Sequence, residues 1–183
     1  IPSRPPMFDL PEPSPRVLAM SLSGGLFGGI MSGTSLDGVD VVLLDVRGDD
    51  LNSIQWSVVG FATTPYAPEE RASIRAAISA GGARDLTLLD RDLGRWFGRA
   101  FRALLDSAGV DSVAVRAVGS HGQTIWHEPP APRGIGATLQ LGGGAFLAEA
   151  LGCPVVGDFR SRDVAAGGQG APLVPWADWV MLR

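Results

Sequence analysis

The sequence predicts an α/β fold in which a mixed sheet begins with antiparallel strands and is covered by helices. Three apolar stretches precede any helical pattern, and strands that follow one another this closely pair antiparallel. After residue 67, helical patterns alternate with short apolar strands, which is typical of a sheet with covering helices. The 183 residues, 45% hydrophobic and 19% charged, are enough for one domain with a substantial core.

The first half of the chain supplies three strands and two helices. Residues 25–31 and 39–46 are apolar runs that flank a turn rich in glycine, serine and threonine, and residues 54–66 form a third predicted strand. Residues 68–82 begin with a proline and two glutamates and end in glycines, which indicates a helix. Residues 86–109 predict a longer helix with one apolar face, formed by Leu89, Leu93, Trp96, Phe97, Phe101, Leu104 and Leu105.

The second half continues the alternation. Residues 113–121 predict a buried strand, residues 137–152 a short strand turning into a helix, and residues 153–159 a further strand. Residues 171–183 have the pattern of a last helix. We therefore expect one domain from residue 21 to residue 183.

The N-terminal residues 1–20 are rich in proline and lack the apolar stretch of a signal peptide. We expect them to be a disordered leader upstream of a natural start at Met20, the alternative being a structured N-terminal arm.

Composition excludes several classes of function. All 15 basic residues are arginine, which removes mechanisms that need a lysine, such as Schiff bases and phosphate-binding P-loops. The net charge of −4, without a basic block, argues against a nucleic-acid partner, and no apolar stretch is long enough to span a membrane. The single Cys153 excludes an internal disulfide and fits a cytoplasmic protein.

The turn between the first two strands contains the first candidate site, residues 33–40, "GTSLDGVD". Gly33 and Gly38 allow close backbone approach to a ligand, and successive N–H groups in such a turn bind anions. Asp37 and Asp40 are candidate Mg²⁺ ligands, because Mg²⁺ prefers carboxylates and water. A plain hairpin with Asp-Gly turn chemistry explains the same residues equally well.

The second candidate site, residues 119–130, "GSHGQTIWHEPP", follows a buried strand, where α/β sheets place ligand groups. Its histidines, His121 and His127, without a carboxylate partner are weak support for zinc. A polar wall that contacts substrate, with Gln123 and Thr124, is the better interpretation, and a capped strand end is the remaining alternative.

The third candidate site spans residues 157–175, where Asp158, Arg160, Arg162 and Asp163 are followed by a Gly-Gly-Gln-Gly loop. Arginine matches carboxylate or phosphate with a planar pair of donors, although a structural network of ion pairs would use the same residues. Because all three polar stretches follow apolar strands, we expect them to form one cleft for an anionic, hydroxyl-rich ligand.

Together the stretches "GIMSGTSLDGVD", "GSHGQTIWHEP" and "PVVGDFRSRDVAAGGQGAPLVP" resemble the anhydro-N-acetylmuramic acid kinases, over about residues 26–183. The resemblance implies an actin-like ATPase lobe of the ribonuclease H-like kind. It also implies that ATP, with Mg²⁺, and water convert 1,6-anhydro-N-acetylmuramic acid into N-acetylmuramic acid 6-phosphate in the cytoplasmic recycling of the cell wall. A homodimer is possible for the complete enzyme.

The resemblance assigns roles to individual residues. The ATP phosphates would contact Gly33, Thr34, Ser35, Leu36, Asp37, Gly38, Val39 and Asp40, with Asp37 and Asp40 toward Mg²⁺. The sugar would contact His121, Gln123, Thr124, Asp158, Arg160, Arg162, Asp163 and Gln169, and one arginine would pair with its lactyl carboxylate.

One feature of this chain departs from actin-like kinases in general, and two depart from the family pattern. Met31 stands where actin-like kinases generally have an aspartate, as it does in this family, and Gly142–Gly144 replaces a usual Gly-Asp. The aspartate that activates water in the family follows an Asn-Ile-Gly-Gly strand, so we expect the base beyond Arg183 and no catalytic residue in this chain. We expect Arg160 and Arg162 to hold Asp158 and Asp163 as ion pairs of lowered basicity.

Two other functions fit the same residues. The chain could be a binding module that keeps the sugar and nucleotide contacts without turnover, which the sequence following Arg183 would distinguish from a kinase. An acetate-kinase-like ATPase fits the composition, but "SHGQTIWHEP" and "GGQGAPLVP" argue against it.

Overall fold

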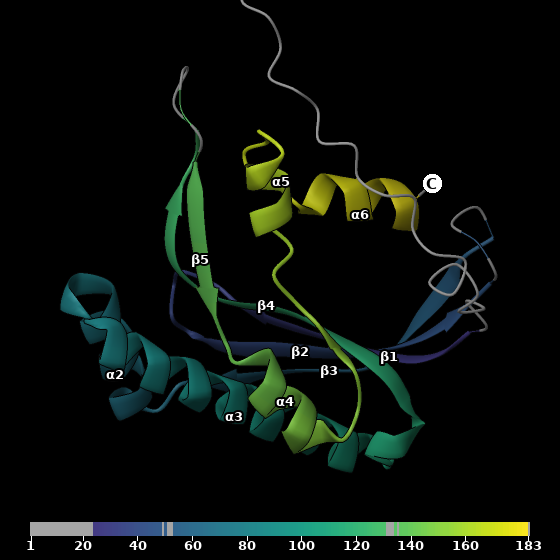
Figure 1. Ribbon diagram of the computed structural model, residues 1–183. Helices are drawn as coiled ribbons and strands as arrows, with labels where there is room; N and C mark the ends of the chain where they lie inside the picture. The colour runs from purple at the N-terminus through teal and green to yellow at the C-terminus, as the bar shows by residue number, and fades with distance from the viewer. Residues whose placement is uncertain (1–23, 49, 51–52, 131–133, 135, 183) are drawn as a thin grey trace, which may run out of the picture.

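The computed structural model describes residues 24–48, 50, 53–130, 134 and 136–182, and the predicted leader, residues 1–20, lies outside them. The described chain forms a mixed sheet of six strands with helices packed on it (Figure 1). This is the predicted α/β architecture, consistent with an actin-like ATPase fold.

The three predicted N-terminal strands are confirmed as an antiparallel meander. They are β1 (Gly25–Ser32), β2 (Gly38–Arg47) and β3 (Gln55–Pro65), with β2 in the middle. Alternate residues of β2, such as Val41 and Leu43, are buried, because one face of the sheet is covered by helices.

Helices α2 (Pro68–Ala80), α3 (Ala83–Ala108) and α4 (Gly144–Leu151) lie on one side of the sheet (Figure 1). Helix α3 begins three residues before the predicted start, because the Asp85 carboxylate accepts from the Gly82 N–H at 3.2 Å and caps the first turn.

Strand β4 (Val115–Glu128) corrects the sequence prediction, which ended a strand at residue 121 and placed the polar stretch 119–130 after it. Its first part pairs parallel with β1, and its last part pairs antiparallel with β5 (Ala137–Leu141). The polar residues stay extended because neighbouring strands satisfy their backbone groups. The start at residue 113 was also wrong, since Ser112–Ala114 form a 3₁₀ turn.

The last elements are shorter than the sequence pattern suggests. Strand β6 is only Val155–Val156 rather than residues 153–159, and it pairs parallel with β4. A short helix that was not predicted, α5 (Ser161–Ala165), follows, and the predicted last helix is α6 (Val174–Met181).

The core lies between α3 and the sheet. The predicted apolar face of α3 is confirmed: six of its seven side chains are buried, while Trp96 is half-buried against the edge of Tyr66, with ring centroids 6.0 Å apart. Gly28 of β1 permits this packing, because a Cβ there would overlap the Phe101 ring.

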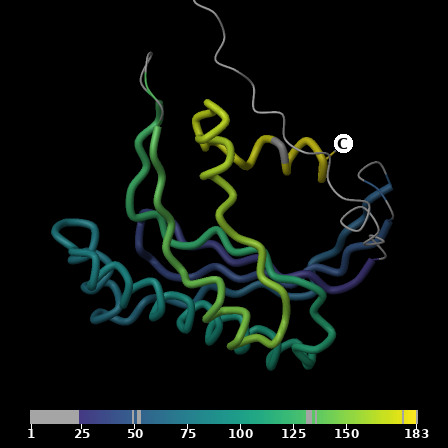
Figure 2. Tube along the Cα trace, viewed as in Figure 1, coloured from purple at the N-terminus to yellow at the C-terminus, as the bar shows by residue number. Residues whose placement is uncertain are grey.

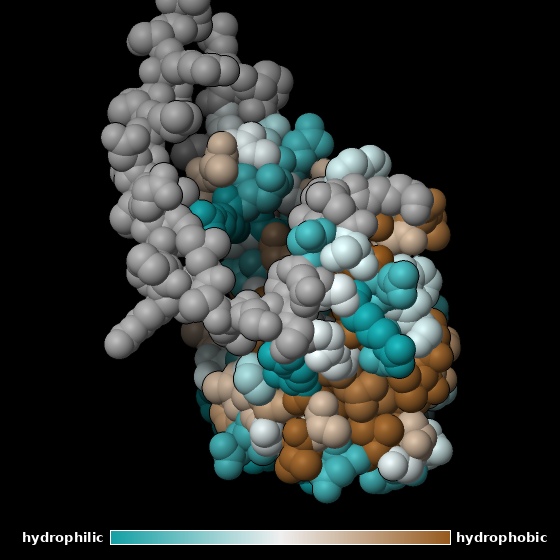
Figure 3. Space-filling view, turned by 90° about the vertical axis from the view of Figure 1, so that its right-hand side faces the viewer, coloured by the Kyte–Doolittle hydropathy of each residue, from teal (hydrophilic) through white to brown (hydrophobic). Residues whose placement is uncertain are grey.

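After β6 the chain passes to the other side of the sheet, where α5 and α6 lie (Figure 2). Helix α6 is joined to β3 by a hydrogen bond from Trp56 Nε1 to the Met181 carbonyl, at 3.4 Å. Apolar side chains remain open on this molecule, and Phe61 of β3 is 63% exposed. Figure 3 shows hydrophobic residues gathered on the lower part of the face that is turned to the viewer.

Candidate functional site

The turn between β1 and β2 presents backbone and hydroxyl groups to solvent. The Leu36 N–H donates to the Gly33 carbonyl at 3.3 Å, and Leu36 has a φ of 58° although its side chain is only 5% exposed. A buried leucine in the left-handed region is strained, and such residues cluster at functional sites. Thr34 and Ser35 are exposed, and neither hydroxyl has a hydrogen-bond partner within the described residues.

A buried network holds this turn from behind. The Ser32 hydroxyl donates to Gln123 Oε1 at 2.6 Å and lies 2.7 Å from the Tyr66 hydroxyl. The Gln123 amide donates to the carbonyls of Gly33, at 3.3 Å, and Thr124, at 3.2 Å. Burial, and secondarily the Glu70 charge, raises the pKa of Tyr66 to about 12, against the opposing Ser32 bond, so its hydroxyl stays protonated.

Gln123 is buried behind the turn, whereas a residue that contacts the sugar is expected to be open to the ligand. Its side chain is fully buried, and both ends of its amide are bonded within the chain. Its position favours a role in fixing the turn, and sugar contact through Gln123 stays a prediction. Thr124 is half-buried beside it, and Val39, at the start of β2, is buried in the core.

Asp37 and Asp40 lie at the open end of the turn, and both are exposed. Asp40 Oδ1 accepts from the Thr63 hydroxyl at 2.6 Å. The Asp37 backbone carbonyl accepts from the Tyr66 N–H at 3.3 Å, and the Asp37 carboxylate has no hydrogen-bond partner within the described residues. The described residues contain no group of three or more His, Cys, Asp or Glu that could hold a metal. Two exposed carboxylates fit Mg²⁺, which is commonly bound by one or two carboxylates together with phosphate and water.

His121 of β4 is joined to the segment after β6. Arg160 Nε donates to His121 Nε2 at 2.9 Å, so the imidazole proton lies on Nδ1, which donates to the Gly122 carbonyl at 2.9 Å. Burial lowers the pKa of His121, the Arg160 charge lowers it further, and the Gly122 bond opposes both. The lowered pKa and the hydrogen bond from Arg160 both favour the neutral imidazole.

The Gly-rich loop after α5 closes on the same arginine. Arg160 Nη1 donates to the Gly170 carbonyl, and the Gly170 N–H donates to Asp163 Oδ2 at 2.6 Å. Within the described residues, neither Asp158 nor Asp163 forms an ion pair with Arg160 or Arg162, which corrects the expected ion-pair network. Backbone geometry is the reason, because Asp163 is bonded to its own loop.

The other predicted sugar contacts of this segment are open to solvent. Arg162 and Gln169 are exposed and have no hydrogen-bond partner within the described part of the chain. Asp158 is also exposed and has a φ of 56°, a left-handed conformation that is uncommon for residues other than glycine.

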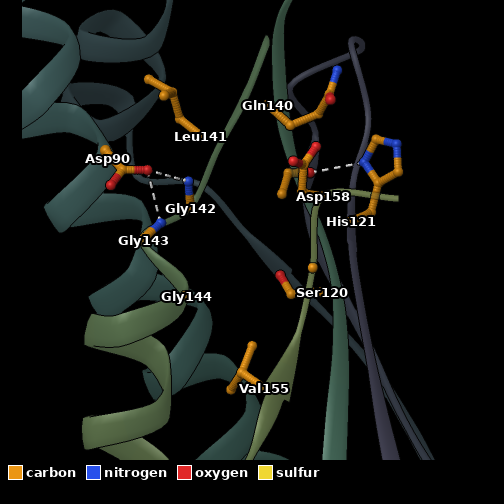
Figure 4. A pocket seen from close by; sticks show the side chains of 12 residues that line it. Asp90, Ser120, His121, Gln140, Leu141, Gly142, Gly143, Gly144, Val155 and Asp158 are labelled. Carbon is orange, nitrogen blue, oxygen red and sulfur yellow. Dashed lines mark hydrogen bonds between the residues drawn. The ribbon is translucent and has the colours of Figure 1, made fainter. Parts of the chain in front are cut away.

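A cavity of about 240 Å³ opens between β4, β5, the start of α4 and the turn after β6 (Figure 4). His121 and Asp158 line it, together with three residues that the sequence analysis missed: Asp90, Ser120 and Gln140. Asp90 Oδ1 accepts from the N–H groups of Gly142 and Gly143, at 2.9 and 2.8 Å. A carboxylate from α3 thus binds the backbone at the start of α4.

A second cavity, of about 360 Å³, lies over β1 and β2. Met31, Asp40 and Phe159 line it, and His121 lines both cavities. Ser120 lies within the second candidate stretch, but its neighbours His121 and Gln123 drew the assignment, and Gln140 lies in a short strand outside every motif. The three predicted stretches are connected through the hydrogen bonds Ser32–Gln123 and Arg160–His121. Within the described residues, Arg162 and Gln169 form no hydrogen bond or ion pair with the other two stretches.

No helix of the described residues is both long and apolar enough to cross a membrane.

Comparison with known proteins identifies the family. The family model described as "Anhydro-N-acetylmuramic acid kinase" matches residues 25–183. Proteins of that name from Gloeobacter violaceus, Paramagnetospirillum magneticum and Bordetella pertussis are 42%, 46% and 47% identical to the chain, over 85%, 80% and 83% of its length. The matches cover 41%, 39% and 38% of these relatives, so the chain spans about two fifths of their length. The chain belongs to the anhydro-N-acetylmuramic acid kinase family and corresponds to the N-terminal part of its members.

Proposed function

We propose that these residues form the nucleotide- and sugar-binding N-terminal lobe of a kinase that acts on 1,6-anhydro-N-acetylmuramic acid. The complete enzyme would use ATP and water to produce N-acetylmuramic acid 6-phosphate and ADP, in the cytoplasmic recycling of peptidoglycan. The family match over residues 25–183 is the observation that carries this proposal.

The turn at residues 33–37 supports nucleotide binding. Its exposed Thr34 and Ser35 hydroxyls are unbonded within the described residues, while the network of Ser32 and Gln123 fixes the backbone behind them. Donors held in place before the ligand arrives bind an anion with little loss of conformational entropy. Asp37 and Asp40 would hold the Mg²⁺ that accompanies ATP and neutralises phosphate charge.

The segment around Arg160 supports binding of the sugar. Arg160 is already bonded to His121 and Gly170, whereas Arg162 has no partner within the described residues. We therefore assign the lactyl carboxylate to Arg162, because a free guanidinium binds a carboxylate with two parallel charged hydrogen bonds. Arg160 would keep His121 neutral and oriented at the wall shared by both cavities.

The proposed reaction balances without a further reactant. The oxygen of water forms a bond to the anomeric carbon, the bond from that carbon to O6 breaks, and O6 takes the γ-phosphoryl group of ATP. A carboxylate base accepts the proton lost by the water. We place this base in the part of the family pattern that follows the segment matching residue 183 of this chain.

The test is a coupled ADP-release assay with the anhydro sugar on the complete kinase that contains these residues. Turnover that requires both ATP and the sugar supports the proposal. Sugar and nucleotide binding without turnover would instead identify a non-catalytic binding module, and absence of both would overturn the proposal.

Nucleotide binding by the turn has a separate test. Gly33→Val should abolish measurable ATP binding in calorimetry while the protein still folds, since a Cβ at residue 33 meets nothing nearer than Ser35 Oγ at 3.7 Å. Asp37→Asn should weaken Mg²⁺–ATP binding by about tenfold, the effect of losing roughly 1.4 kcal/mol. Asp106→Asn, an exposed aspartate on α3, is the control and should leave the affinity unchanged. Unchanged ATP affinity in both turn variants would contradict the assignment.

A further inference from the structure

The cavity beside α4 contains two buried polar atoms without a partner. Ser120 Oγ and Gln140 Oε1 have no hydrogen bond within the described residues, and Ser120 is only 5% exposed. Both side chains line the cavity, and Figure 4 shows the Ser120 hydroxyl turned toward the α4 side. A buried oxygen without a donor destabilises the folded chain, which a ligand in the cavity would relieve.

Neighbouring hydrogen bonds fix which end of the Gln140 amide is unpaired. Gln140 Nε2 donates to Thr138 Oγ1 at 2.8 Å, and Thr138 Oγ1 lies 3.1 Å from His127 Nδ1. The Thr138 hydroxyl can therefore accept from Gln140 and donate to His127. Oε1 is the remaining end of the amide, and it can only accept a hydrogen bond.

The carboxylates of the cavity add further acceptors. Asp158 is unpaired within the described residues, Asp90 uses only Oδ1, and His121 has both nitrogens bonded. No arginine lines the cavity. A ligand carboxylate in this cavity would be repelled by Asp90 and Asp158. Hydroxyl and amide N–H groups of a ligand could instead donate hydrogen bonds to these acceptors.

We propose that this cavity binds the neutral, donor-bearing part of the sugar, its hydroxyls and acetamido N–H, with Ser120 and Gln140 as direct contacts and the lactyl carboxylate outside. This proposal rests on the kinase function proposed above, and it names the part of the sugar that this subsite binds. The volume of about 240 Å³ equals that of roughly eight water molecules at ~30 Å³ each, enough for part of a sugar ring.

Binding to the full 183-residue chain tests the subsite independently of phosphoryl transfer. The probes are 1,6-anhydroglucose, which has hydroxyls only, 1,6-anhydro-N-acetylglucosamine, which adds the acetamido group, and 1,6-anhydro-N-acetylmuramic acid, which adds the carboxylate. The readout is the NMR signal of the Gln140 side-chain amide. We expect it to shift with the acetamido sugar, and to the same extent with the muramic acid. A shift that requires the carboxylate, or no shift with any of the three sugars, overturns the proposal.

Two variants separate ligand contact from a structural role. Ser120→Ala and Gln140→Met should each weaken binding of 1,6-anhydro-N-acetylglucosamine about tenfold. Ser120→Ala should also raise the melting temperature of the unliganded chain, because it removes a buried unpaired oxygen. Controls are Ser57→Ala and Gln55→Met, both on the exposed edge strand β3. Unchanged affinity in both cavity variants, or loss of binding together with a lower melting temperature of Ser120→Ala, overturns the proposal.

The outcomes also separate this proposal from the proposed function. A complete kinase that turns over the anhydro sugar but is unaffected by Ser120→Ala and Gln140→Met would keep the function and remove the subsite. A shift of the Gln140 signal in a protein without turnover would keep the subsite and remove the function.

Discussion

At the scale of single residues, Arg160 connects strand β4 to the loop after α5 through its hydrogen bonds. It donates to His121 Nε2 at 2.9 Å and to the Gly170 carbonyl. Its charge and the burial of the imidazole both lower the pKa of His121. Protonation of His121 would place a proton on the nitrogen that accepts from Arg160, so the contact exists only with neutral histidine.

This coupling predicts a pH dependence of stability. Because the pKa of His121 is lower in the folded than in the unfolded chain, its contribution is complete above the unfolded value of about 6.5 and is lost as pH falls below it. Urea unfolding at about pH 7.5 and about pH 5.5 measures this loss. His121→Gln should show a smaller loss than the wild type. Equal losses for wild type and His121→Gln would contradict the prediction.

The two arginines of the sugar-binding segment should differ in effect. Arg162→Ala is expected to raise the KM for the anhydro sugar in the complete kinase by about tenfold or more, and to leave the KM for ATP unchanged, because a charged hydrogen-bonded pair contributes about 1.5–3 kcal/mol. Arg160→Ala should also lower the stability of the protein, since it frees His121 and Gly170. Steady-state kinetics and thermal unfolding of the two variants test this. An equal rise in both KM values for Arg162→Ala would argue against a carboxylate contact.

At the scale of elements, the close approach of α3 and α4 positions one wall of the candidate sugar cavity. Gly94 and Gly98 lie one turn apart on α3, and both are buried against the α4 segment. A Cβ on Gly94 would lie 2.8 Å from the Gly143 carbonyl, and one on Gly98 2.9 Å from Ala150 Cβ. These glycines are retained in the helix because α4 leaves no room for a methyl group.

Gly94→Ala should therefore destabilise the protein, although alanine is the better helix former by about 1 kcal/mol. Overpacking of a tight contact is expected to outweigh that gain and lower the free energy of unfolding by about 1–3 kcal/mol. Urea denaturation measures the change. The reverse substitution at an exposed site, Ala103→Gly, gives the intrinsic propensity in the same helix. A stabilised Gly94→Ala variant would show that α4 can move away freely.

At the scale of the whole molecule, the chain spans about two fifths of the length of its relatives, and apolar side chains are exposed on it. Phe61 and Val58 of the edge strand β3 are 63% and 56% exposed, and Trp179 of α6 is 61% exposed. Exposed apolar groups of this size favour association, so a protein of these 183 residues should form oligomers as its concentration rises. Size-exclusion chromatography over a range of concentrations checks this.

The same 183 residues should bind ligand without turnover. General-base catalysis raises the reaction rate by roughly 10²–10⁴-fold. Closure of the protein around the substrate aligns the reacting groups and excludes water. We place both the base and the closing lobe in the part of the family pattern that follows residue 183. The ADP-release assay on this chain should stay at background. Turnover that disappears in Asp158→Asn or Asp163→Asn would place the base within this chain instead.

Sequence patterns determined the elements whose local signals are strong. The apolar runs that became β1, β2 and β3 and the one-sided apolar face of α3 need no knowledge of their partners, because burial periodicity is written along the chain. Motif resemblance likewise determined the family, which the match over residues 25–183 confirms.

Only the tertiary structure decided the extent of β4 and the environment of the polar side chains. Residues 119–128 stay extended because β1 and β5 flank them, and these partners are distant in sequence. Gln123 became a buried support of the turn, while Ser120 and Gln140 were left unpaired beside a cavity. Whether a polar residue is bonded or free depends on which groups from other elements reach it, and that follows from the packing of the whole sheet rather than from local sequence.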